Sequence, residues 1–447
     1  SNVWWRFLNK YDGDKRVYVS IMSEEVSAGL WTRSHKLIKF DVAGDISVPE
    51  ETNVAQSLMG QMLFCKYYEG FGNTLIVKIT CVDTNGLLDK LPIRTGMSVE
   101  LAFRHASLED EEVFEFSQAN NNNLIIVNID GNHEDKRQMY TLTCITPTTL
   151  SNHTTRAYHK YTGKIDSTVR SILSQLLSAP ESRQVVDETS NTYDFCGNYT
   201  RPINLINRLA TKSVTPKAEP DSPEKGLCGY MFFETQKTGY NFRSVMNMMK
   251  EESDFPVYEK VGAKDAMNTN PFTLASTPKF VESQDLIKKL RMGQYQSHNV
   301  VYNIMDRNVN SYIHKSETDG EVASSADEIP SRRILSVLDL GSTTAKDNEL
   351  AELAEKVTWR QSHAAAQYQL LYSQMLDVTI PMNLNLEVGM TLNFKFPDLN
   401  TGEGTTAGVT PSSGKYLIAR LSHEFGNPRG DFTGLTLVRE HYLPYEE

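Results

Sequence analysis

Two stretches of the chain match each other in pattern: GMSVELAF at Gly96–Phe103 and GMTLNFKF at Gly389–Phe396. In both, a glycine opens a run in which every second residue is apolar, beginning at the methionine. Successive side chains of a β-strand point to opposite faces, so each run predicts a strand with one buried face. The two runs are consistent with one structural element used twice.

The spacing of later residues extends the match. From each glycine, 28 positions and then 18 more lead to a pair of leucines, Leu124 and Leu142 in the first copy and Leu417 and Leu435 in the second. Equal spacing across three strands predicts a small β-module present twice. Periods of 20–50 residues are typical of solenoids, whereas two copies this far apart indicate two domains.

A coincidence between two amphipathic strands is the alternative. The middle strands favour that alternative, because Leu124–Ile129 is apolar on both faces while Tyr416–Leu421 is mixed. The sequence therefore leaves both interpretations open. The duplicated module is the hypothesis with the larger consequence, since it bears on symmetry.

Length and charge limit the function classes. A chain of 447 residues is expected to form more than one domain. The formal net charge of −11 argues against a protein that grips nucleic acid through its phosphates, and fits a surface that nucleic acid passes without sticking. No apolar run approaches the roughly 20 residues of a membrane span, and the first residues lack the pattern of a secretory signal.

The cysteines predict reduced, structural thiols in a cytosolic protein. They are odd in number and scattered, and none forms a CxxC pair: Cys65, Cys81, Cys144, Cys196 and Cys228. Two of them, Cys81 and Cys144, lie in strand-like runs and are expected to be buried.

The pattern along the chain predicts an α+β fold that is mainly β, with two similar small, tube-like β-barrel domains. We expect a first β-barrel domain over residues 1–155, an α/β insertion domain over 156–300, a linker region with a long helix over 301–375, and a second β-barrel domain over 376–447. The long helix is predicted at Glu349–Met375.

Within the insertion, two helices and a hairpin are predicted. Asp166 is a candidate N-cap for a helix with an apolar stripe that ends at Pro180. Pro202 marks the first turn of a second helix. The segment Gly229–Val245 has two aromatic runs around a Lys-Thr-Gly turn, which is typical of a β-hairpin.

The sequence predicts no catalytic, cofactor-binding or metal-binding residues. Asp130–Asp135 is acidic, but it lacks the spacing of an EF-hand loop and lies where a hairpin turn is expected. Glu109–Glu112 is a run of four acids on a predicted loop, which indicates a solvated face more simply than a glycosidase pair. No P-loop, nucleophile elbow or dinucleotide fingerprint is present. We therefore expect no enzyme activity.

Three other segments could form contact surfaces. The tryptophans Trp4, Trp5 and Trp31 fit either an interface anchor or core packing. A basic cluster, Lys288, Lys289 and Arg291, is more simply a solvated helix end than a phosphate site. The loop Pro397–Gly414 is rich in glycine and threonine and is long enough to be ordered only against a partner.

A module present twice in one chain has a symmetry consequence. Three copies of the chain carry six modules, so a trimer can present pseudo-sixfold symmetry on one side and threefold symmetry on the other. Closed cyclic assemblies are the ordinary outcome for homo-oligomers. Such a trimer could join a hexameric ring to a trimeric object.

The order of elements resembles the central baseplate hub protein of contractile bacteriophage tails, which is also related to the N-terminal part of type VI secretion spike proteins. The resemblance rests on the aromatic hairpin Gly229–Ser244, on Gly389–Leu392, and on the last two strands, Lys415–Glu424 and Thr433–Leu437. It covers roughly 280 residues in pattern. The segments 250–282 and 316–348 have no counterpart in it.

The resemblance implies a structural hub of the tail baseplate. It implies a homotrimer whose two tube-like barrels per chain form a pseudo-hexameric ring around a channel for DNA and the tape-measure protein, with DNA passing and not tightly bound. The hexameric tail tube protein would dock on one face and the trimeric central spike protein on the other, with baseplate wedge proteins as further partners. The location implied is the virion, in the tail baseplate, after assembly in the host bacterial cytoplasm, with no membrane insertion.

Two alternatives belong to other function classes. A tail-associated peptidoglycan hydrolase would use Glu109–Glu112 or Asp130–Asp135 as its acids. A host-surface binding module would use the loop Pro397–Gly414. Cell-wall zymography and deletion of that loop, respectively, would distinguish them from the hub.

Overall fold

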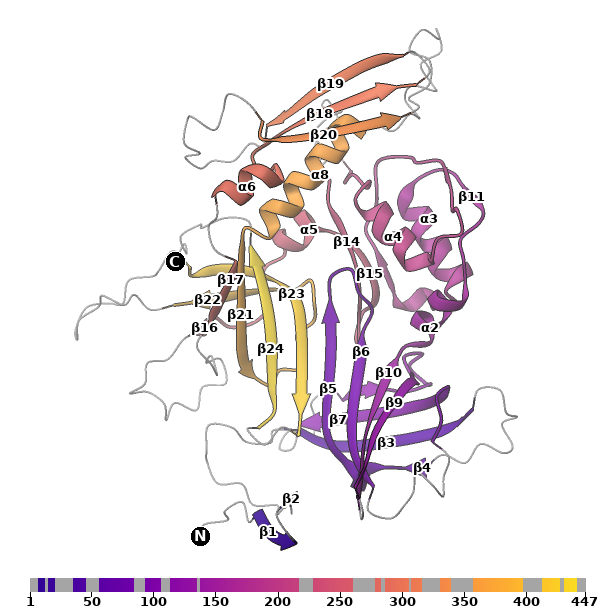
Figure 1. The fold of residues 1–447 in the computed structure, drawn as a ribbon, viewed down its shortest axis with the longest axis vertical. Helices are drawn as coiled ribbons and strands as arrows, with labels where there is room; N and C mark the ends of the chain where they lie inside the picture. The colour runs from indigo at the N-terminus through magenta and orange to yellow at the C-terminus, as the bar shows by residue number, and fades with distance from the viewer. Residues whose placement is uncertain are drawn as a thin grey trace, which may run out of the picture.

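The computed structural model describes residues 7–12, 15–20, 35–45, 56–83, 93–105, 113–134, 137–216, 228–259, 278–282, 286–304, 307–315, 330–338, 357–396, 412–426 and 430–439. One large curled sheet dominates these residues, accompanied by four small sheets and short helices (Figure 1). The sequence prediction of a mainly β fold is confirmed.

The large sheet has fourteen strands, eleven of them on one continuous path. In the order of that path they are β17 (Lys279–Glu282), β21 (Gln374–Pro381), β24 (Phe432–Arg439), β23 (Gly414–Phe425), β5 (Met62–Gly70), β6 (Ile76–Asp83), β10 (Arg137–Ile145), β9 (Leu124–Glu134), β7 (Met97–His105), β3 (His35–Asp45) and β4 (Gln56–Ser57). Three strands branch from it: β16 (Tyr258–Glu259), β22 (Thr391–Lys395) and β8 (Phe114–Phe116).

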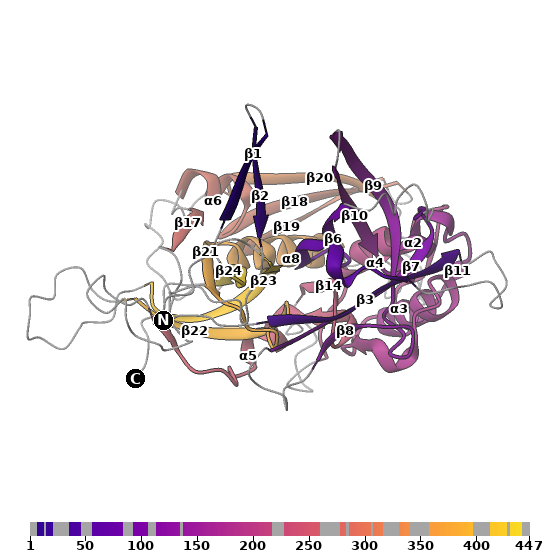
Figure 2. The same ribbon diagram turned by 90° about the horizontal axis from the view of Figure 1, so that it is seen from below.

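Both copies of the repeated pattern lie in this one sheet. The sequence predicted two separate barrel domains, whereas in the structure the strands of both copies belong to one sheet, because β23 of the second copy pairs with β5 of the first. In Figure 1 the strands β24, β23, β5 and β6 run along the long axis of the molecule, while β7 and β3 run across it, so the sheet turns strongly. Figure 2 shows the same path from below, from β21 and β24 through β23 and β6 to β10 and β9.

One face of the sheet supplies the main core. Alternate residues of β21 are buried, as the period of two requires, and in β5 the buried residues include Cys65 and Tyr67. The core cluster combines residues of both copies, from Phe40 to Val438. Cys81 and Cys144 are buried free thiols in this core, as the sequence predicted, and Cys196 is exposed.

The insertion packs as a small α/β layer with its own core. It follows α2 (Pro147–Thr154), and its helices are α3 (Ile165–Ser171) continued by the π-helix η3 (Ile172–Leu176), the 3-10 turn η4 (Glu181–Arg183), α4 (Pro202–Ala210) and α5 (Val245–Lys250). Its strands are β11 (Lys160–Tyr161), β12 (Gln184–Val186), β13 (Phe195–Cys196), β14 (Tyr230–Thr235) and β15 (Gly239–Ser244). The predicted hairpin and the helix at Pro202 are confirmed.

The prediction for Asp166 was wrong in detail. The helix α3 begins one residue earlier, at Ile165, with Lys164 at the N-cap position. Asp166 lies in the first turn, where its Oδ1 accepts a hydrogen bond of 2.7 Å from the Thr189 hydroxyl. A carboxylate in the first turn still favours the helix through its dipole, which explains why the residue looked like a cap.

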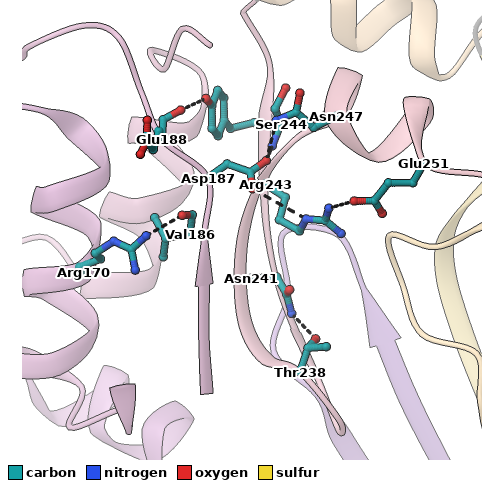
Figure 3. A network of polar contacts seen from close by, with 11 residues as sticks. Arg170, Val186, Asp187, Glu188, Thr238, Asn241, Arg243, Ser244, Asn247 and Glu251 are labelled. Atoms are coloured by element: carbon teal, nitrogen blue, oxygen red, sulfur yellow. Dashed lines mark hydrogen bonds and ion pairs between the residues drawn. The ribbon is translucent and has the colours of Figure 1, made fainter. Parts of the chain in front are cut away.

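Polar contacts hold the hairpin to the rest of the insertion (Figure 3). The Asp187 Oδ2 accepts hydrogen bonds from the backbone N–H of Ser244, at 2.9 Å, and from Asn247 Nδ2, at 3.1 Å. The Arg243 guanidinium pairs with Glu251, and its Nε lies 4.0 Å from Asp187 Oδ1. The end of β15 is therefore fixed before the chain enters α5.

The segment between the copies adds a three-stranded sheet and a helix. It contains α6 (Leu286–Met292), β18 (Gln296–Asn303), β19 (Asn308–Lys315), β20 (Arg332–Leu338) and α8 (Val357–Leu371), which packs against β18 and β19. The predicted long helix is confirmed as α8 over its middle part; it ends before Met375, which belongs to β21. Elsewhere, β1 (Phe7–Asp12) pairs with β2 (Lys15–Ser20), and η2 (Met59–Gln61) precedes β5.

Candidate assembly surface

The two copies share one strand topology. We define module 1 as β7, β9, β10, β6 and β5, and module 2 as β22, β23, β24, β21 and β17, each in its order of pairing. Every neighbouring pair in both modules is antiparallel. The match that the sequence indicated for three strands therefore extends, in order and direction of pairing, to five.

The glycines that open the repeat have the same local geometry. Gly96 has φ 96° and Gly389 has φ 90°, values that favour glycine over any residue with a Cβ. The N–H of Gly96 donates to the carbonyl of Ile126 at 2.8 Å, and the N–H of Gly389 donates to the carbonyl of Ile418 at 3.0 Å. The turn that starts each module is therefore stabilised by the same backbone contact.

A β-bulge occurs at the same place in both modules. In module 1 the register of β9 and β10 shifts beside Val127, between Thr143 and Cys144 on β10. In module 2 the register of β23 and β24 shifts beside Ala419, between Thr436 and Leu437 on β24. Bulges are specific features of a fold, so their equivalent positions extend the match between the two modules.

The structure corrects the alignment of the middle strand by one residue. Leu124 pairs with Val99 of β7, and Tyr416 pairs with Leu392 of β22, so Leu124 corresponds to Tyr416 and not to Leu417. A slip of one residue exchanges the two faces of a strand. This slip explains why the middle strands looked inconsistent when they were compared by equal spacing.

The junction between the modules is a tightly packed antiparallel pair of strands, β23 and β5. His423 lies opposite Tyr67, and their rings stack with centroids 5.7 Å apart. Burial lowers the pKa of His423 to about 3, so the ring is neutral, and its Nδ1 lies 2.9 Å from the Thr433 hydroxyl. Phe425 stacks on Phe103 with centroids 3.8 Å apart. These contacts make the two modules one packed body.

The opposite face of the junction carries charge. Glu424 lies opposite Lys66, and their Oε1 and Nζ atoms are 2.8 Å apart. Both side chains are partly exposed, so this ion pair contributes at most about 1 kcal/mol. Its importance is that it marks the register of the junction on the open face.

Three buried carboxyl groups tie the hairpin of the insertion to the junction. Glu69 of β5 accepts hydrogen bonds from the backbone N–H groups of Gln236, at 3.0 Å, and Val388, at 3.1 Å. Glu387 accepts one of 2.7 Å from the N–H of Lys237, and Glu234 accepts one of 3.2 Å from the N–H of Leu75. The insertion is therefore bonded to both modules at once.

These carboxyl groups are buried, and burial raises their pKa values. Burial, reinforced by the charge of Glu387, raises the pKa of Glu69 to about 8, and burial raises the pKa of Glu234 to about 7. Burial also raises the pKa of Glu387. The region where the insertion and both modules meet therefore binds protons more readily than an unfolded chain.

A hollow of about 740 Å³ spans both modules and is lined by residues of β5, β6, β17, β21, β23 and β24. Lys279 and Arg420 lie there with Asp377, next to small polar residues such as Ser422 and Thr436. The net charge of −11 is therefore not concentrated on this part of the surface.

The sequence predicted a hairpin turn at the acidic segment Asp130–Asp135, but the first residues of this segment do not form a turn. Strand β9 runs to Glu134, so residues 130 to 134 are part of the sheet. No group of three or more potential ligand residues that could hold a metal ion is found within the described residues. The basic cluster Lys288, Lys289 and Arg291 lies on the helix α6, as the sequence predicted.

Other predicted contact segments lie outside the residues that the structure describes. These are Glu109–Glu112, the tryptophans Trp4, Trp5 and Trp31, and all but the last residues of the loop Pro397–Gly414. None of the helices in the described ranges combines the length and the apolar character of a membrane span.

Comparison with solved structures identifies the fold. The 43 kDa tail protein of prophage MuSo2 from Shewanella oneidensis matches with a TM-score of 0.53 and 10% identity, over 90% of this chain and 98% of that chain. A tail protein from Neisseria meningitidis MC58 matches with a TM-score of 0.48 and 10% identity, over 90% and 97% of the chains. A type VI secretion component from Escherichia coli has a TM-score of 0.41 and 8% identity, over 87% and 76%.

The predicted resemblance is thus confirmed: the chain is similar in structure to a phage tail protein. No protein-family model matches the chain, and no curated protein matches it in sequence. A likeness at 10% identity concerns the fold alone.

Proposed function

We propose that the chain is the structural hub of a contractile phage tail baseplate. In this proposal it forms a homotrimer that joins the hexameric tail tube to the trimeric central spike and encloses a channel for DNA and the tape-measure protein. Wedge proteins are further partners, and the protein is located in the virion after assembly in the host cytoplasm. Its role is structural and not enzymatic.

The observation that carries the proposal is the direct pairing of two equivalent modules in one sheet. One chain then contributes two adjacent segments of the same strand topology to a ring, and three chains contribute six. The surface formed by the modules has pseudo-sixfold symmetry, while the rest of the trimer has threefold symmetry. A joint between six-membered and three-membered structures requires both symmetries in one object.

The surface at the junction of the modules supports a channel. Its described residues carry both signs of charge, because Lys66 pairs with Glu424, and Lys279 and Arg420 lie near Asp377. A polyanion would meet acidic as well as basic groups there, so it would gain less from counterion release than on a purely basic surface. Such a lining suits a passage through which DNA moves without being held.

The domain organisation proposed from the sequence fits this role. The first tube-like domain covers 1–155, the insertion 156–300, the linker with the long helix 301–375 and the second tube-like domain 376–447. One strand of module 2, β17, comes from the region assigned to the insertion and pairs with β21. The insertion therefore also takes part in the second tube-like domain.

The direct test is the mass of the purified protein in solution, by light scattering or mass photometry. We expect three times the mass of the chain, and a monomer at micromolar concentration would contradict the hub. Cell-wall zymography tests the non-enzymatic role, and we expect no clearing. Clearing that is lost on substitution of Glu109–Glu112 would favour the hydrolase instead.

A further inference from the structure

We propose that neighbouring copies of this chain associate by pairing β9 of one copy with β17 of the next, in the antiparallel register that β23 and β5 adopt within the chain. The inference rests on the proposed function only for the number of copies. The edges and the register come from the repeat itself. The partner is therefore a second copy of this chain.

The first edge belongs to β9. In module 2, β23 pairs with β22 near its start and with β5 from Arg420 to Phe425. In module 1, β9 pairs with β7 near its start, at Leu124 and Ile125. Beyond these residues that edge of β9 has no strand partner among the described residues. The open edge of β9 is thus the equivalent of the β23 edge that accepts β5.

The second edge belongs to β17. Lys66 of β5 lies opposite Lys78 of β6, and Lys279 of β17 lies opposite Asp377 of β21. Lys78 lies opposite Thr143 of β10, and Asp377 lies opposite Thr436, the matching threonine of β24, so Lys78 and Asp377 are equivalent. Lys279 therefore corresponds to Lys66. The other edge of β17 is the end of the sheet in the described part of the chain.

The register of the new pair follows from these equivalences. Glu424 lies opposite Phe432 of β24, and Asn132 lies opposite Met139, the equivalent residue of β10. Asn132 therefore corresponds to Glu424. Since Glu424 pairs with Lys66 inside the chain, Asn132 is expected to lie opposite Lys279 of the neighbouring copy.

The charges at this register are complementary. On β9, the residue two positions before Asn132, on the same face of the strand, is the exposed Asp130. A lysine opposite Asn132 is then a diagonal neighbour of Asp130, within reach of its long side chain. Lys279 and Asp130 are both exposed in the single chain. Lys279 would thus take the place that Lys66 has in the internal junction. Its acidic neighbour would lie two positions away from Asn132, the residue that corresponds to Glu424.

The pairing is head-to-tail, because each copy offers one edge of each kind. Interfaces of this kind produce a closed ring if the rotation between copies returns to the start, and a filament if it does not. The internal junction already sets a rotation and translation between module 1 and module 2, and the new junction would repeat them between copies. A sheet that is curled by that rotation can close after a small number of modules.

Cysteine cross-linking tests the register. The variant Asn132→Cys/Lys279→Cys is made in a Cys196→Ser background, because Cys196 is exposed and the four other cysteines are buried. A short bismaleimide is added to the protein at the concentration where its mass in solution is measured. We expect covalent dimers and trimers on a denaturing gel, with no product larger than a trimer.

Matched controls fix the interpretation. The pair Lys66→Cys/Glu424→Cys, at the internal junction, should cross-link within one chain and show that the reagent spans this geometry. The single variants, and Asn132→Cys combined with Lys160→Cys on β11, should give no covalent oligomer. The mass of each variant in solution is measured before cross-linking, to show that the variants assemble as the wild type does.

Each outcome decides a specific point. A trimer in solution without cross-linking at 132 and 279 would overturn this interface and leave the hub proposal intact. A monomer in solution would overturn both. A ladder that continues beyond the trimer would overturn the closed ring and indicate a filament. Products that form only after tail tube protein is added would assign the edges to that partner instead.

Discussion

At the scale of single residues, Gly389 shows how closely the insertion is fitted to module 2. Its φ of 90° is unfavourable for residues with a Cβ, and a Cβ built there would lie 2.7 Å from Phe233 Cζ and 3.1 Å from Met248 Sδ. We expect Gly389→Ala to lower the free energy of unfolding by about 2–4 kcal/mol, from backbone strain and overpacking together.

Gly72→Ala is the matched control for that substitution. Gly72 has φ 75°, and a Cβ there would have no atom within 4 Å, so only the backbone cost of about 1–2 kcal/mol applies. Chemical denaturation followed by fluorescence measures both variants. Equal losses for the two glycines would contradict the close packing of Gly389 against the insertion.

The buried carboxyl groups predict a dependence of stability on pH. The pKa of Glu234 is raised by burial to about 7, so the folded state binds a proton that the unfolded state releases at about 4.5. This contribution to stability is present below pH 4.5 and is lost as the pH rises through about 7. Glu234→Gln keeps the shape of the side chain and removes the titration.

We therefore expect the difference in free energy of unfolding between Glu234→Gln and the wild type to change in favour of the variant by about 2 kcal/mol between pH 5 and pH 8. Urea denaturation at a series of pH values measures it. A difference that stays constant over this range would show that Glu234 does not titrate at the junction of the insertion with the modules.

At the scale of elements, the junction of β23 with β5 is held by its buried face and not by its ion pair. His423 is 1% exposed and stacks on Tyr67, whereas Glu424 is on the open face. We expect His423→Ala to cost about 2–4 kcal/mol and Glu424→Ala at most about 1 kcal/mol. Thermal or chemical unfolding of the two variants measures this, and a larger loss for Glu424→Ala would contradict it.

The repeat shows what the sequence could and could not predict about elements. The strands that begin at Met97 and Thr391 were predictable, because a glycine with positive φ and strict alternation leave a clear signal. The one-residue bulges at Val127 and Ala419 were not, since a bulge is decided by twist and pairing in the sheet. Equal spacing in the sequence therefore gave an alignment of the middle strand that was off by one residue.

Two further features of the structure, one strand and one set of buried acids, could not be predicted from the sequence for other reasons. Strand β17 is short and contributes to module 2 from far away in the sequence, so no local pattern links Lys279 to Asp377. The residues that join the insertion to the modules, Glu69, Glu234 and Glu387, look like surface acids in the sequence. Only the fold shows that hydrogen-bond donors from other segments surround them.

At the scale of the whole molecule, the two modules form one continuous sheet. That continuity fixes the rotation and translation between the two modules, and the proposed adapter role rests on this fixed relation. The sequence predicted duplicated barrels and their use in a trimer, but it could not show that the copies pair edge to edge. The open edges of β9 and β17 follow from that pairing.

An image of the purified oligomer along its axis, by electron cryomicroscopy, tests the central claim most directly. The account predicts three chains arranged so that six β-modules surround an open centre at equal angular steps, with threefold symmetry in the surrounding density. A ring in which module 1 and module 2 occupy different radii or unequal steps, or a particle that contains a single chain, would contradict it.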